Sequence, residues 1–373
     1  MAGLYIHIPF CASRCIYCGF YSTTLKALQD RYVSALGREM ELRTQDCVPH
    51  HPAINTIYLG GGTPSQLSKA NLQRLFLYIN KVYDTRDVIE TTIECNPDDL
   101  NEEMVETLSK LPVNRISMGV QTFSDERLHF LHRRHKAADV KTAIERLRAI
   151  GIRNISIDLM FGFPGETIDE WRSDIDKALA LDVEHISAYN LMYEEGTTLY
   201  ELWQQQKVIP LGEEQERKMY ETLINHLATA RYEHYEISNF AKPGFRSRHN
   251  SSYWNETPYI GIGAAAHSYD RLSRRWNISN LHAYMEAIEG GTLPETIESI
   301  DEDTRYNDLI TTAMRTKEGI DISSLSEKHR DYLLSNARPC LQQKLVNLED
   351  QRLRLTRKGL FVSDTVMSDL MYV

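Results

Sequence analysis

The sequence predicts an α/β protein whose core is a parallel β-sheet. Strand-like apolar runs alternate with segments of helical period along residues 1–200, and this alternation is typical of parallel sheets. The runs end in loops that carry polar residues or glycine. Because ligands of parallel sheets bind beyond the carboxyl ends of the strands, these loops are the expected site.

Six strands are predicted in the first part of the chain, with helices between them. The expected strands are residues 4–8, 55–59, 88–94, 114–120, 154–160 and 185–191, and the clearest helices are 25–43 and 69–83. Six β/α repeats are fewer than the eight of a closed barrel. The sequence therefore argues against a closed eight-stranded barrel.

A different pattern begins near residue 200. A charged helix is predicted at 211–232, and further helices are expected near 305–315, 327–345 and 358–370, with a short strand at 352–356. We expect three domains: the β/α core at 1–200, an extension of it at 201–300, and a small α-rich, winged-helix-like C-terminal domain at 301–373. Packing or partner binding fits the last domain better than DNA binding does.

Composition narrows the possible functions. The chain has 373 residues, a net charge of −10, 42% hydrophobic and 25% charged residues, which is ordinary for a globular protein. The negative charge argues against a nucleic-acid binder, because phosphate contacts need clustered cations. No apolar stretch of about 18 residues and no secretory signal is visible, and six cysteines are too few for a disulfide scaffold. A cytoplasmic location is expected.

Three cysteines lie close together just after the first predicted strand. Cys11, Cys15 and Cys18 have the spacing C-x3-C-x2-C, and thiolates in so tight a loop can converge on one metal centre. Zinc would need a fourth ligand, whereas a 4Fe–4S cluster held by three cysteines leaves one iron open. No pair among the other cysteines has ligand spacing. A zinc knuckle or a chance cluster remains the alternative.

This cysteine motif, with Tyr17 directly before its third cysteine, resembles the radical S-adenosylmethionine (SAM) superfamily. In that superfamily the open iron is chelated by the amino and carboxylate groups of SAM. The resemblance implies an open, partial (β/α)6 barrel over about residues 1–200. It also implies that Cys11, Cys15 and Cys18 hold the cluster, with Tyr17 packed beside it.

Other strand ends carry residues suited to ligand binding. Gly60-Gly61-Gly62-Thr63-Pro64 follows the second strand, and such glycines let a backbone approach a ligand closely. Glu94 and Asp158 lie in strands, where a carboxylate is costly unless it is paired or bound to a ligand. Gln121 ends the fourth strand, and Arg133 follows twelve residues later. A tight turn, salt bridges and capping contacts are the simpler interpretations of these residues.

Together the blocks resemble the oxygen-independent coproporphyrinogen III oxidase family, which includes HemN. The matching segments are Tyr5-Ile6-His7-Ile8-Pro9-Phe10-Cys11, the glycine block, Thr92-Ile93-Glu94, Ser117-Met118-Gly119-Val120-Gln121, and Asp158 with Gly162-Phe163-Pro164-Gly165. The resemblance implies that one set of residues lines a SAM site: Tyr5, Gly61, Gly62, Thr63 and Glu94. It also implies that Gln121, Arg133 and Asp158 match positions that contact a second SAM in the oxidase. One or two SAM molecules are both compatible with these residues.

Three features resemble the HemW branch, whose members the family describes as heme chaperones without oxidase activity. Phe20 stands where the oxidase motif has a further cysteine, and the first strand begins at residue 4 without the oxidase's N-terminal extension. Residues 248–254 match the HNxxYW motif of that branch. The resemblance implies that His249 is a heme ligand, because imidazole binds heme iron well. Tyr253 and Trp254 offer apolar surface to a porphyrin.

The sequence therefore predicts a heme chaperone of radical SAM fold. It is expected to bind heme, a 4Fe–4S cluster and SAM, and to deliver heme to an acceptor protein such as a membrane respiratory enzyme. A homodimer and peripheral association with a membrane are compatible with this prediction. The main alternative is an anaerobic oxidase that decarboxylates two propionates of coproporphyrinogen III. A zinc-dependent interaction protein is the third class.

Overall fold

A parallel six-stranded sheet forms the centre of the molecule. The computed structural model describes residues 2–44 and 52–373, and Cys47 lies outside them. The strands lie side by side in chain order, all parallel. They are β1 (Ala2–Ile8), β2 (Ile54–Gly61), β3 (Glu90–Cys95), β4 (Arg115–Gln121), β5 (Asn154–Phe161) and β6 (His185–Asn190). The predicted parallel α/β core is confirmed.

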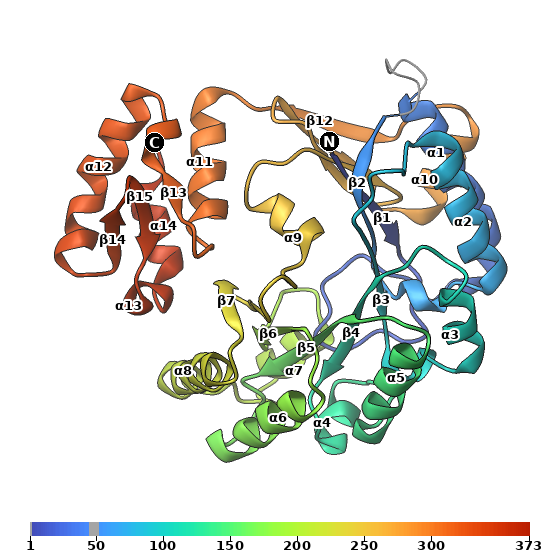
Figure 1. The fold of residues 1–373 in the computed structure, drawn as a ribbon, viewed down its shortest axis with the longest axis horizontal. Coiled ribbons are helices and arrows are strands. Elements are labelled where there is room, and N and C mark those ends of the chain that lie inside the picture. Colours follow the sequence, from blue (N-terminus) through green and yellow to red (C-terminus); the bar gives the residue numbers. More distant parts are fainter. Residues whose placement is uncertain (1, 45–51) are drawn as a thin grey trace.

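Helices cover the outer face of this curved sheet (Figure 1). They are α1 (Gln29–Thr44), α2 (Lys69–Val82), α3 (Glu102–Leu108), α4 (Asp125–Phe130), α5 (Ala137–Ala149), α6 (Ile168–Ala180), α7 (Thr198–Gln204) and α8 (Glu213–Thr229). Short 3-10 turns occur at η1 (Lys26–Leu28), η2 (Pro64–Gln66) and η3 (Pro97–Asp99). In α2 the buried residues Leu72, Leu75, Phe76 and Ile79 follow the helical period, which turns one apolar stripe toward the sheet.

Further strands extend the sheet on both sides. Beyond β6 lie the antiparallel strands β8 (Asn239–Ala241) and β7 (Glu233–Glu236). On the other side β9 (Tyr259–Ile262) pairs parallel with β1. The antiparallel strands β10 (His267–Tyr269), β11 (Ser273–Asn277) and β12 (Glu295–Ser299) follow it. Within the described residues the sheet has twelve strands, and it stays open between β7 and β12. Helix α10 (Leu281–Glu289) contacts α1.

The last 70 or so residues form a small unit with its own core. Helices α11 (Glu302–Ala313), α12 (Glu327–Gln342), α13 (Arg357–Leu360) and α14 (Ser363–Leu370) surround a small sheet and the 3-10 turn η4 (Ile322–Ser324). The sheet has the order β13 (Ile320–Asp321), β15 (Arg352–Leu355), β14 (Val346–Glu349). The helix expected at 358–370 is divided into α13 and α14. The separate core, which runs from Tyr306 to Leu370, supports our proposal of a boundary near residue 301.

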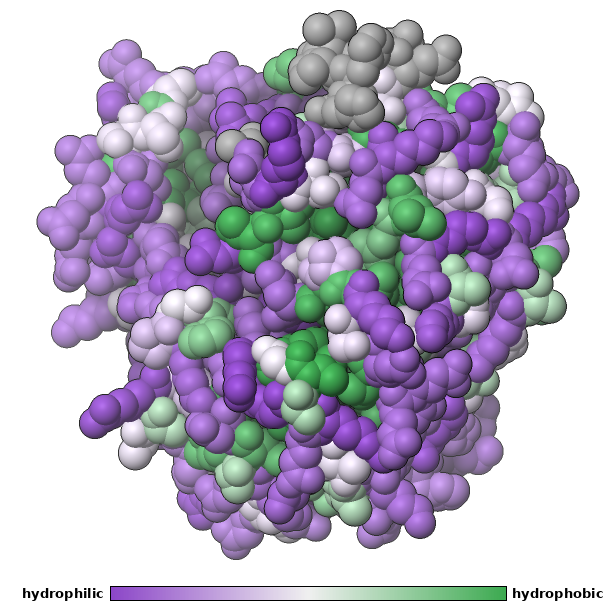
Figure 2. Space-filling view, turned by 45° about the vertical axis from the view of Figure 1, so that its right-hand side comes forward, coloured by the Kyte–Doolittle hydropathy of each residue, from purple (hydrophilic) through white to green (hydrophobic). Residues whose placement is uncertain are grey.

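The surface is mixed in character. Figure 2 shows one face on which hydrophilic side chains surround several separate patches of apolar surface. Among residues 2–44 and 52–373, no helix has the length and apolar character needed to cross a bilayer.

A candidate cofactor cavity at the carboxyl ends of the strands

One cavity of about 680 Å³ brings together most of the predicted site residues. It is lined by residues from the loop after β1 and from the ends of the next five strands. The predicted residues that line it are Cys11, Cys15, Tyr17, Cys18, Gly61, Gly62, Thr63, Glu94, Gln121, Arg133 and Asp158. The structure therefore places eleven of the thirteen predicted residues around one space. Tyr5 and His249 are not among the lining residues.

The cysteine loop is held in place by backbone hydrogen bonds on both sides. The amide of Cys11 donates to the carbonyl of Thr23 at 2.9 Å, and that of Ile16 donates to the carbonyl of Leu131 at 3.3 Å. All three thiols are half-buried, and burial raises the pKa of Cys11 and Cys18. Three soft donors on one fixed loop fit a 4Fe–4S cluster.

Two polar side chains already point at these thiols. The Thr63 hydroxyl donates to Cys11 Sγ at 3.5 Å, and Arg133 Nη1 donates to Cys15 Sγ at 3.7 Å. Hydrogen bonds and positive charge near sulfur stabilise the thiolate form that a metal requires. Within the described ranges, no group of three or more His, Cys, Asp or Glu side chains has the arrangement of a single-ion site.

The glycine turn brings β2 against the start of the cysteine loop. Gly61 has a φ of +109°, and a Cβ there would lie 2.5 Å from Cε1 of His7. A Cβ on Gly62 would lie 2.8 Å from the backbone of Pro9. The amides of Gly62 and Thr63 donate to the carbonyls of Ile8 and Phe10, each at 2.9 Å. Because only glycine fits so close an approach, the turn places Thr63 beside Cys11.

Glu94 is the principal carboxylate of the cavity wall. It accepts hydrogen bonds from the Tyr58 hydroxyl at 2.7 Å and from the Gly61 amide at 3.1 Å. Burial raises the pKa of Glu94 to about 7, and the nearby Asp158 adds to the effect. Burial also raises the pKa of Asp158, whose carboxylate accepts from the Ser117 hydroxyl at 3.5 Å. Both acids suit a cationic ligand that would restore their charge.

The raised pKa of Glu94 predicts a pH-dependent loss of stability in the ligand-free protein. Its folded pKa of about 7 lies above the ordinary value of 4.5, so the stabilisation is present below pH 4.5 and is lost as pH rises through 7. We expect the free energy of unfolding to fall by about 2 kcal/mol relative to Glu94→Gln over this range. The full shift would correspond to about 3 kcal/mol, but cavity water screens the carboxylate.

Chemical denaturation of both proteins at several pH values measures this difference. The amide introduced by Glu94→Gln cannot ionise, so the variant provides the reference curve at each pH. If the free energies of unfolding of the two proteins change with pH in the same way between pH 4.5 and 8, the raised pKa of Glu94 is contradicted.

Gln121 and Arg133 also line the cavity. Gln121 adopts a φ of 68° at a bulge, where the register between β4 and β5 shifts after Gly119. Bulges of this kind often redirect a side chain beside a site. Arg133 donates to Asn96 Oδ1 at 2.6 Å and to the carbonyl of Gly119. These bonds hold its guanidinium between the third and fourth strands and close to Cys15.

Tyr5 lies behind the lining rather than in it. Its hydroxyl is hydrogen-bonded to His7 Nδ1 at 3.1 Å, and its ring stacks with that of Tyr58 at a centroid distance of 6.2 Å. Tyr58, which does line the cavity, was missed in the sequence. It belongs to a buried apolar strand, and nothing in that pattern separates a cavity tyrosine from a core tyrosine.

His249 belongs to α9 (Arg248–Tyr253), a short helix in the middle of the molecule (Figure 1). Its ring is fully buried and stacks with Tyr58 at 5.1 Å. Its Nδ1 is hydrogen-bonded to the Thr56 hydroxyl at 2.8 Å, and its Nε2 to the Tyr253 hydroxyl at 3.0 Å. Burial lowers the pKa of His249 to about 3, so the imidazole is neutral. In this arrangement both ring nitrogens already have partners.

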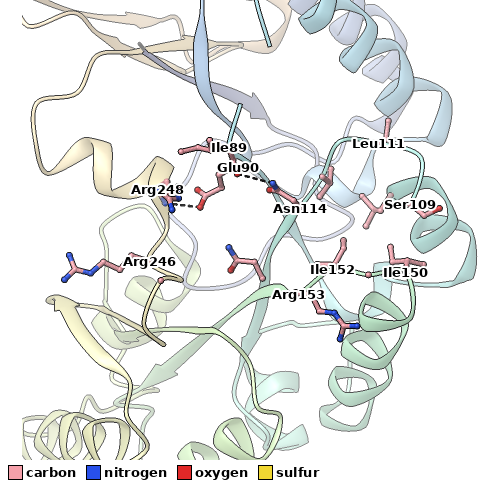
Figure 3. A pocket seen from close by; sticks show the side chains of 15 residues that line it. Ile89, Glu90, Ser109, Leu111, Asn114, Ile150, Ile152, Arg153, Arg246 and Arg248 are labelled. Carbon is pink, nitrogen blue, oxygen red and sulfur yellow. Dashed lines mark hydrogen bonds between the residues drawn. The ribbon is translucent and has the colours of Figure 1, made fainter. Parts of the chain in front are cut away.

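A second cavity, of about 330 Å³, lies at the other ends of the strands (Figure 3). Its wall includes Glu90, whose carboxylate accepts from the amides of Arg248 and His249 at 3.0 and 2.9 Å. This contact ties the start of α9 to the first residue of β3. Asn114 lies on the neighbouring strand end (Figure 3) and donates to the carbonyl of Ile89 at 3.1 Å.

Most arginines near α9 already form ion pairs with carboxylates. Arg246 pairs with Glu233 at 2.7 Å and with Glu318 at 2.9 Å. Arg274 pairs with Asp308 at 2.9 Å, and Arg275 lies 3.4 Å from Asp270. The pairs of Arg246 with Glu318 and of Arg274 with Asp308 join the sheet region to the C-terminal unit.

Comparisons with known proteins agree with this fold. A family model described as the radical SAM superfamily matches residues 5–178, and one described as the HemN C-terminal domain matches residues 300–362. The chain is 37% identical to the heme chaperone HemW of Bacillus subtilis over 98% of each chain. It is 33% identical to the heme chaperone HemW of Lactococcus lactis, over 97% of this chain and 95% of the relative.

The fold also resembles a solved structure. Coproporphyrinogen III oxidase (HemN) from Escherichia coli, described as a radical SAM enzyme, superimposes with a TM-score of 0.84. The alignment covers 99% of this chain and 90% of that one, at 22% sequence identity. At this identity the likeness concerns the fold alone. It confirms the predicted partial barrel followed by a small C-terminal domain.

Proposed function

Because this chain belongs to the HemW family of heme chaperones, within the radical SAM superfamily, we propose that it binds heme and delivers it to an acceptor protein. The proposal includes a 4Fe–4S cluster and SAM as resident groups. The observation that carries it is the cavity in which Cys11, Cys15 and Cys18 share one space with Glu94 and Asp158. Soft donors and buried acids in one cavity suit a cluster beside a cationic ligand.

Each wall of the cavity has a proposed role. Cys11, Cys15 and Cys18 would hold the cluster, and the cluster would supply an iron that can bind SAM. The Glu94 carboxylate accepts from the amino group of SAM, next to the turn formed by Gly61, Gly62 and Thr63. Tyr17 packs beside the cluster, and Tyr5 supports Tyr58 from behind. Gln121, Arg133 and Asp158 offer polar groups to the rest of the ligand.

Heme is proposed to bind beside α9, with His249 as an iron ligand. Asn250, the next residue of that helix, lines the main cavity, so α9 borders the same space. Iron coordination through Nε2 requires that the hydrogen bond to Tyr253 be broken, and the freed hydroxyl then needs another partner. We extend the proposal to a membrane respiratory enzyme as acceptor, to peripheral membrane association, and to a homodimer as the assembled form.

A heme titration and an anaerobic activity assay test this function together. We expect reconstituted protein to develop a Soret band that saturates with heme, and to pass the heme to an apo-acceptor. Coproporphyrinogen III under reducing conditions should not be converted. Phe20, 71% exposed at the cavity, stands where the oxidase motif has a cysteine, which supports this expectation.

Each outcome has a clear meaning. Stoichiometric formation of protoporphyrinogen IX would replace the chaperone with the oxidase. Absence of any heme binding by cluster-loaded protein would refute the chaperone proposal directly.

A further inference from the structure

Arg115 is a buried cation for which the described residues supply no ion-pair partner. It is the first residue of β4 and is only 1% exposed. Its Nε and Nη1 atoms are shielded from solvent, and neither has a hydrogen-bond partner among residues 2–44 and 52–373. A buried charge in this state is costly unless something else compensates it.

Two acids of the cavity wall, Glu94 and Asp158, interact with the charge of Arg115. Burial raises the pKa of Glu94 and of Asp158, and the positive charge of Arg115 opposes this shift in both. Neither carboxylate comes within ion-pair distance of the guanidinium. Burial thus favours the neutral form of both acids. The guanidinium therefore has unused donors and only weakened negative charge around it.

Arg115 borders the cavity although its Nε and Nη1 atoms are shielded from solvent, so a ligand must displace neighbouring side chains to bond these two donors. Arg115 lines the same cavity as the cysteine loop, together with Ser117 and Asn250. Burial and, after it, the charge of Arg115 lower the pKa of His249 in α9. A guanidinium matches a carboxylate with two parallel hydrogen bonds. Arg115 and Asn250 of α9 thus line the same cavity.

We propose that Arg115 binds a propionate carboxylate of the tetrapyrrole in this cavity. The inference rests on the proposed function, because heme carries two propionates and His249 is the proposed iron ligand. Arg133 and Arg134 also line the cavity, but both already have protein partners. Arg133 bonds Asn96, and Arg134 pairs with Asp98 and Asp99.

Equilibrium titrations with hemin and with hemin dimethyl ester test the proposal. The ester keeps the iron and the macrocycle but has no carboxylate. We expect wild-type protein to prefer hemin over the ester by at least about tenfold, because a charge-assisted pair is lost with the ester. Arg115→Gln should abolish this preference by weakening hemin alone, whereas Arg115→Lys should retain part of it.

Arg134→Gln is the matched control, since it removes an arginine from the same cavity wall and should leave the preference unchanged. Circular dichroism and cluster iron content verify folding. If Arg115→Gln does not fold, Arg115→Lys is the variant that tests the proposal. A preference for hemin over the ester equal to that of the wild type would then overturn the proposal. If wild-type protein binds hemin and hemin dimethyl ester with equal affinity, as it would if ordered water solvates Arg115, the proposed role of Arg115 is also overturned. The proposal that the protein is a heme chaperone is not affected by that result. Wild-type protein that binds neither compound refutes both.

Discussion

Replacement of Cys11, Cys15 and Cys18 together by alanine is expected to abolish the visible iron–sulfur absorbance of anaerobically reconstituted protein. The three thiols lie on one loop at the cavity, and thiolates are the usual ligands of a 4Fe–4S cluster, so this variant loses all three proposed ligands. The loop itself should persist, because backbone hydrogen bonds hold it. The visible iron–sulfur absorbance and the bound iron per chain, each measured after desalting, give the result.

The other cysteines provide the control. Cys95 and Cys340 are buried in two separate cores, Cys95 also lines the cavity, and Cys47 lies outside the described residues. Replacement of all three by alanine should leave the iron content near that of wild type, with a modest cost in stability from the two core sites. Loss of the cluster from this second variant would overturn the assignment of the ligands.

His249→Ala is expected to shift or weaken the Soret band and to stop transfer to an acceptor. The variant removes the proposed iron ligand together with the bonds to Thr56 and Tyr253. Because it also leaves a hole beside Tyr58, we expect unfolding to become easier by about 2–4 kcal/mol. Circular dichroism and iron content must therefore be measured on the same sample before the heme titration is interpreted.

Tyr253→Phe separates iron binding from simple packing. It keeps the ring that contacts His249 at 5.4 Å but removes the hydroxyl bonded to Nε2. If Nε2 binds iron, heme affinity should stay the same or rise by up to about tenfold, because one competing bond is gone. If α9 only closes the barrel, both variants should alter stability and leave the Soret band unchanged. If His249→Ala binds heme with normal affinity but does not transfer it to an acceptor, His249 has a role in heme transfer.

Several central strands were predictable because they contain a short apolar run, as β1 and β2 do, whereas β3 (Glu90–Cys95) is more polar. Parallel strands buried on both faces have no polar alternation to confuse the pattern. Strands β9 to β12 were not predicted, since they are short, and β12 is largely exposed and carries two glutamates. Their place in the sheet depends on pairing with β1, which sequence spacing does not reveal. The hairpin formed by β7 and β8 was not predicted, for the same reason.

Site residues that lie close together in the sequence could be predicted. Site residues that come together only through packing of distant segments could not. The spacing of Cys11, Cys15 and Cys18 indicates a shared centre without any structure. Arg115 looks in the sequence like a polar residue at the edge of an apolar run, and only the three-dimensional arrangement shows that the described residues leave its guanidinium unpaired. The hydrogen bond between His249 and Thr56 likewise joins residues almost 200 positions apart, which no motif encodes.

The pairing of β1 with β9 has a consequence for how the chain folds. Ile6, near the N-terminus, pairs with Ile262, so the edge of β1 stays open until more than two thirds of the chain has been made. Contacts between residues so distant in sequence form slowly, because a long loop must close first. A nascent or truncated core that ends before β9 would expose an unpaired apolar strand edge, a template for aggregation. Production of the whole chain at low temperature or with chaperones should therefore yield more native protein than expression of the core alone.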